Sequence, residues 1–67
     1  MISEREIWLA ARAMILRYGS NAGIEAAERA DDALEHGDME GCALWKRILA
    51  AVEKLQAEKP PPGETVQ

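Results

Sequence analysis

Apolar residues recur at helical spacing along three segments of the chain, and two glycines separate these segments. At about 100° per residue, the apolar positions that share one face of the first segment are Ile7, Trp8, Ala11, Met14, Ile15 and Tyr18. Gly19 and Gly37 follow the first and second segments, where glycine commonly ends a helix because it adopts a left-handed conformation without a steric penalty. The pattern predicts an all-α fold with helices over about 3–18, 21–36 and 38–58.

Residues suited to capping stand where each helix is expected to begin. Ser3 and Glu6 have the S-x-x-E spacing of a capping box. Ser20 or Asn21 can cap the second helix, and Asp38 can cap the third.

The second and third helices are joined by a very tight turn. Because Gly37 and Asp38 leave almost no connecting chain, the two helices should form an antiparallel hairpin. The second helix has a ridge of small residues, which lets neighbouring helices approach closely. This ridge consists of Ala22, Ala26, Ala30 and Ala33.

The length of 67 residues allows one small domain, which we place at residues 1–59. An isolated core of this size supplies only about 3–5 kcal/mol. The single cysteine, Cys42, excludes an intramolecular disulfide, and no Cys/His spacing suggests a structural zinc site. Three prolines end the last helix and predict a disordered tail over 60–67. We therefore expect a three-helix mini-domain completed by oligomerisation.

A second group of large apolar residues lies away from the main helical stripes. Ile2, Leu9 and Leu16 are spaced by seven and fall nearly opposite the main face of the first helix. Leu44 and Leu55 widen the stripe of the third helix, which indicates either a deeply wrapped helix or a second partner. Isolated exposed leucines are common on protein surfaces. Since a short chain needs additional burial, we expect these five residues to form the interface of a homodimer.

Acidic residues are concentrated in the second helix. The net charge is −4, and the segment 20–36 carries five acids against Arg29 alone. These acids are Glu25, Glu28, Asp31, Asp32 and Glu35. An acidic chain argues against nucleic-acid binding. The acidic face is either a solvated exterior or a contact for a basic partner.

These observations favour a small helical protein-interaction module that self-associates. The alternative is a small acidic regulator or inhibitor of the anti-defence type. Such a protein would bind a basic, nucleic-acid-handling protein through Glu25, Glu28, Asp32 and Glu35.

No arrangement of residues indicates catalysis or a cofactor. His36 shares a helical face with Asp32, but a histidine at a helix C-terminus more often interacts with the helix dipole than with a metal. Cys42 lies on an apolar stripe and is expected in the core. Met14 and Met39 are likewise expected to be core residues. We predict neither an enzyme nor a metal or cofactor site.

Charged residues interrupt the apolar part of the first segment. Arg5, Arg12 and Arg17 break the run that a signal peptide or a membrane-spanning helix requires. We therefore expect no membrane association and a cytoplasmic protein with a reduced thiol.

Several short motifs together resemble a family of small uncharacterised proteins found mostly in alphaproteobacteria. The motifs, within about 6–56, are Glu6-Ile7-Trp8 with Ala10-Ala11, Tyr18-Gly19, Ala30-Asp31 before Leu34, Gly37-Asp38, and Trp45-Lys46-Arg47-Ile48 with Ala51-Val52 and Leu55. The resemblance implies a short all-helical protein of unknown function, with no active site to carry over.

Overall fold

The computed structural model describes residues 2–57, and their regular secondary structure is entirely helical. Helix α1 spans Glu4–Tyr18, α2 spans Ala22–Glu35 and α3 spans Met39–Ala57, with one 3₁₀ turn, η1 (Gly19–Asn21), between α1 and α2. The all-α prediction is confirmed. Helices α1 and α2 begin and end within one residue of their expected bounds, and α3 begins within one residue of its expected start. The last expected helical residue, 58, and the expected tail, 60–67, lie outside the described residues.

The first helix is fixed at both ends by local hydrogen bonds. The Glu6 N–H donates to Ser3 Oγ at 3.2 Å, and the Ser3 N–H donates to Glu6 Oε1 at 3.0 Å. This reciprocal pair confirms the capping box. At the other end Gly19 has a φ of 60° and its N–H donates to Ile15 O. A side chain is strained at this φ, so glycine ends the helix here.

The start of α2 differs from the prediction. Asn21 makes no side-chain cap, because η1 has already coiled the chain into φ −89° and ψ 2° rather than the extended conformation of a capping residue. The prediction that Ser20 or Asn21 caps this helix was therefore wrong, and the 3₁₀ turn takes the place of a side-chain cap. The Gln56 side chain supports this junction by donating to Gly19 O at 3.1 Å.

The turn between α2 and α3 follows the prediction. Gly37 has a φ of 74° and donates its N–H to Leu34 O at 3.0 Å. Asp38 donates its own N–H to Ala33 O at 2.8 Å, and its Oδ1 accepts from the Gly41 N–H at 2.9 Å. Asp38 thus closes one helix and caps the next, which allows a turn of only three residues.

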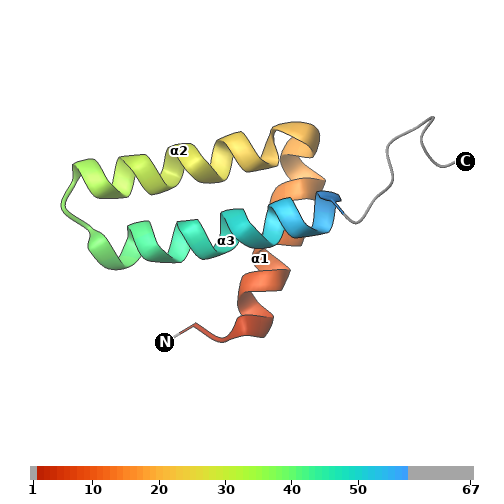
Figure 1. Cartoon of the computed structure of the whole chain (residues 1–67), viewed down its shortest axis with the longest axis horizontal. Helices are drawn as coiled ribbons and strands as arrows, with labels where there is room; N and C mark the ends of the chain where they lie inside the picture. The colour runs from red at the N-terminus through yellow and green to blue at the C-terminus, as the bar shows by residue number, and fades with distance from the viewer. Residues whose placement is uncertain (1, 58–67) are drawn as a thin grey trace, which may run out of the picture.

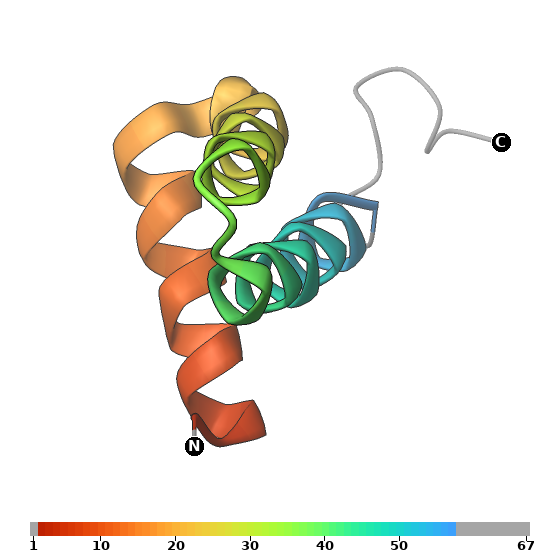
Figure 2. The same cartoon turned by 90° about the vertical axis from the view of Figure 1, so that its left-hand side faces the viewer.

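Helices α2 and α3 lie side by side and run in opposite directions, and α1 crosses both of them steeply (Figure 1). Seen along the hairpin, α1 packs against α2 and α3 together (Figure 2). The most extensive packing joins α2 to α3, and α3 also has a larger contact with α1 than α2 has. Helix α3 is therefore the element that both other helices cover.

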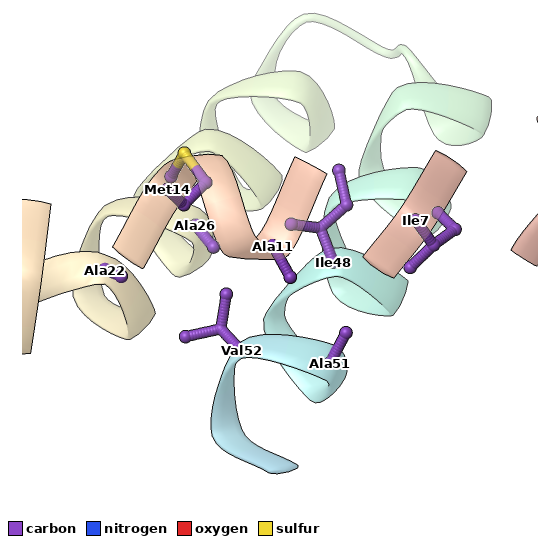
Figure 3. Packing of buried hydrophobic residues seen from close by; sticks show 8 residues of the cluster. All are labelled: Ile7, Ala11, Met14, Ala22, Ala26, Ile48, Ala51 and Val52. Atoms are coloured by element: carbon purple, nitrogen blue, oxygen red, sulfur yellow. The ribbon is translucent and has the colours of Figure 1, made fainter. Parts of the chain in front are cut away.

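The core forms where the three helices meet. Its buried cluster consists of Ile7, Ala11 and Met14 from α1, Ala22 and Ala26 from α2, and Ile48, Ala51 and Val52 from α3 (Figure 3). Ala30 and Cys42 are also buried, so that five of the ten buried apolar residues are alanines. Small side chains let the helices approach closely, but each removes little apolar area from water. The interior thus consists largely of small side chains and contributes modest hydrophobic stabilisation.

Candidate interaction surface

The outer face of α1 carries two exposed leucines. Leu9 is 56% exposed and Leu16 is 80% exposed. Both were placed in the expected interface from their spacing. The inner face of the same helix holds Ile7, Ala11 and Met14, so α1 has large apolar residues on two opposite sides. Among the residues that the structure describes, 2–57, only the inner side is covered by the other helices.

The other three residues of the expected interface lie partly inside the molecule. Ile2, Leu44 and Leu55 are half-buried and pack against the core. The wide stripe of α3 therefore corresponds to the wrapped helix that the sequence allowed, because α1 and α2 cover different parts of it. Each of these residues contributes less free apolar surface than Leu9 or Leu16.

Two surface hollows bring some of the five residues together. Leu9 and Leu55 line a hollow of about 500 Å³ together with Trp8, Arg5 and Arg12. A second hollow, of about 680 Å³, includes Ile2 and Leu44. Leu16 lines neither of them, because it lies farther along the outer face of α1. The structure thus divides the five residues among three places on the surface.

Further exposed apolar residues were missed by sequence reasoning. On α2, Ile24 is 60% exposed and Leu34 is 50% exposed. Met39, expected in the core, is 63% exposed because it begins α3 directly after the turn that joins α2 to α3. That expectation was wrong. A signal for Ile24 was available, since its spacing from Ala22 and Ala26 places it away from the buried ridge.

The four acidic residues proposed as a binding face do not share one environment. Glu28, Asp32 and Glu35 are exposed, whereas Glu25 is half-buried and lies 3.6 Å from the Arg29 guanidinium. Asp32 has the His36 ring beside it. Glu28 and Glu35 therefore offer the carboxylates that are most accessible to a partner.

The arginine beside Glu25 joins all three helices. Its guanidinium donates to the Tyr18 hydroxyl at 3.1 Å and lies 5.3 Å from the centre of the Trp45 ring. A cation over an aromatic face is attracted by the ring's quadrupole. Arg29 and Glu25 thus act together within the fold, and Glu25 is less available than its neighbours on α2.

His36 and Cys42, the residues weighed as a metal ligand and as a reactive thiol, both have ordinary structural environments. His36 Nδ1 lies 2.8 Å from Asp32 O, a contact expected of a histidine at a helix C-terminus. Cys42 is buried and unpaired. Within residues 2–57 no three His, Cys, Asp or Glu side chains are grouped closely enough to hold a metal ion. In the same part of the chain, no helix has the length and apolar character needed to cross a membrane.

Comparisons with known protein families, with curated proteins and with solved structures found no match to this chain. The resemblance to the alphaproteobacterial family accordingly stays a prediction.

Proposed function

We propose that this protein is a non-enzymatic interaction module that self-associates through the outer face of α1. The observation that carries the proposal is the exposure of Leu16, at 80%, on the same face as the half-exposed Leu9. Covering both side chains removes apolar surface from water, at about 25 cal/mol per Å². A second copy of the chain is the simplest partner, since symmetric dimers are the commonest soluble oligomers.

The composition of the core supports this proposal. Half of the buried apolar residues are alanines, and an isolated domain of this size has about 3–5 kcal/mol of stability. Association that occurs only between folded copies adds to that stability. We also propose a cytoplasmic location, because the buried Cys42 thiol is unpaired and suits a reducing compartment.

The experiment is a measurement of mass by light scattering over a range of protein concentrations, on the wild type and on Leu16→Asp. We expect the wild type to associate and the variant to be a monomer with a lower melting temperature at high concentration, because aspartate cannot be buried unpaired. Ala50→Asp is the matched control, since Ala50 is exposed on α3 and the same charge is introduced there. A wild type that stays monomeric throughout would overturn the proposal.

The second candidate function is an acidic regulator that binds a basic protein through α2. The observation in its favour is that Glu28, Asp32 and Glu35 are exposed on one helix. It predicts binding to poly-L-arginine that is lost at high ionic strength and in a variant combining Glu28→Lys with Glu35→Lys. Equal binding by this variant and by one with two reversed acids on α3, Glu40→Lys with Glu53→Lys, would contradict it.

A further inference from the structure

Four of the five exposed large apolar side chains within residues 2–57 belong to two helices whose outer faces have opposite charge. Leu9 and Leu16 lie on α1, and Ile24 and Leu34 lie on α2. Covering the exposed apolar residues on either face would remove apolar surface from water. The opposite charges of the two faces favour contact between one face and the other.

On α1 the exposed residues Arg5, Leu9, Arg12 and Leu16 form what we call the basic stripe. Their spacings of four, three and four residues keep them on one side of a helix. This side faces away from the core residue Ile7, and it alternates arginine with leucine. The basic stripe therefore offers charge and apolar surface in a fixed order.

On α2 the exposed residues Ile24, Glu28, Asp31 and Glu35 form what we call the acidic stripe. Their spacings are also four, three and four residues, so this stripe has the same length and geometry as the basic stripe. It lies away from the buried ridge that contains Ala26, and Leu34 stands at its edge.

The two stripes match when the helices run antiparallel. Arg12 then stands opposite Glu28, and Leu16 stands opposite Ile24. Arg5 stands opposite Glu35, because the arginines and the glutamates are both separated by seven residues, or about 10 Å along a helix.

A parallel arrangement of the two stripes gives fewer complementary pairs of residues. It sets Leu9 and Leu16 against the two glutamates and leaves only Arg12 opposite an acid, Asp31. In the antiparallel arrangement Leu9 stands opposite Asp31, the one position where apolar and charged residues meet, and Leu34 lies one turn away. The pattern of charged and apolar residues therefore favours antiparallel docking of the basic stripe on the acidic stripe.

The stripes of one chain cannot reach each other, because α1 and α2 pack on a common core through their other faces. We propose that the basic stripe of one copy docks antiparallel on the acidic stripe of a second copy. This inference depends on the proposed self-association and names its two surfaces. It also gives the acidic face of α2 a basic partner, the α1 helix of another copy.

Charge reversal tests the pairing directly. One variant combines Arg5→Glu with Arg12→Glu, and the other combines Glu28→Arg with Glu35→Arg. Each variant alone sets like charges against each other, so we expect its dissociation constant to rise about tenfold or more. An equimolar mixture restores two complementary stripe pairs and should associate about as tightly as the wild type. Light scattering and sedimentation measure the masses.

Two control variants change the net charge by the same amounts on α3. Lys46→Glu with Lys54→Glu and Glu40→Arg with Glu53→Arg alter exposed residues outside both stripes, so the mass should stay that of the wild type. Helix content by circular dichroism checks that every variant is folded.

The outcomes separate this inference from the proposed function. If both stripe variants still associate as the wild type does, or if mixing them fails to restore association, the pairing is overturned while self-association stands. If the wild type is a monomer at every concentration, both are overturned. Loss in each variant and recovery on mixing supports both.

Discussion

The two faces of α2 are made of opposite kinds of residue. Its inner face has Ala22, Ala26 and Ala30, whereas its outer face has Ile24 among exposed carboxylates. In most domains the large apolar residues of a helix are inside. Here close approach of the helices requires small residues inside, and the large side chains that do not fit there are exposed. The difference teaches that an inner face built of small residues leaves the larger apolar side chains of the same helix exposed.

The largest effect is expected when isoleucine is replaced in the core, and the comparison is the same replacement on the surface. Ile48 is 3% exposed in the core, and Ile24 is 60% exposed on α2. We expect Ile48→Ala to lower the free energy of unfolding by about 2–5 kcal/mol, which would leave much of the protein unfolded. Ile24→Ala should change it by less than about 0.5 kcal/mol in the monomer. Urea unfolding followed by circular dichroism at low protein concentration measures both, and equal losses would contradict the contrast.

A smaller effect is expected from enlarging an inner alanine. Ala26 is fully buried between α2 and its neighbours, so Ala26→Leu should lower the free energy of unfolding by about 1–3 kcal/mol through overpacking. Ala50 is exposed on α3, and Ala50→Leu is the control, with an expected change within about 0.5 kcal/mol. Thermal melts of the two variants decide the matter. A stabilised Ala26→Leu protein would show that the interior has unused space.

The smallest effect distinguishes two helical glycines. A Cβ at Gly23 would lie 3.7 Å from Leu49 Cδ1, an ordinary contact, so Gly23→Ala should raise the free energy of unfolding by up to about 1 kcal/mol. A Cβ at Gly41 would overlap the Asp38 carboxylate, and displacing that cap costs about as much as the better helix former contributes. Gly41→Ala should therefore have little net effect. Equal stabilisation by both substitutions in urea unfolding would contradict the role of the cap.

Local signals determined how much of the fold was predictable. The capping box at Ser3, the positive φ values at Gly19 and Gly37, and the cap at Asp38 all depend on residues within one turn of a helix end. The bounds of α1 and α2 and the start of α3 were accordingly predicted within one residue. The 3₁₀ turn at 19–21 was not, because nothing in three small or polar residues distinguishes it from a loop.

The surface was predicted less completely than the helices. Leu9 and Leu16 were placed outside from spacing alone, and the structure exposes both. Leu44 and Leu55 are half-buried because α3 is covered from two sides, and the pattern of one helix does not say how many neighbours it has. Ile24 was not predicted, because a single large apolar residue on an otherwise acidic face forms no apolar stripe.

The alanine face of α2 also affects the entropy of folding. An alanine side chain has no rotamers to lose, so ordering this face costs no side-chain conformational entropy. That cost falls instead on the branched and long side chains of α1 and α3, among them Ile7, Met14 and Ile48. The inner surface of α2 therefore has the same shape before and after packing. The side chains whose rotamers become ordered when the core forms belong mainly to α1 and α3.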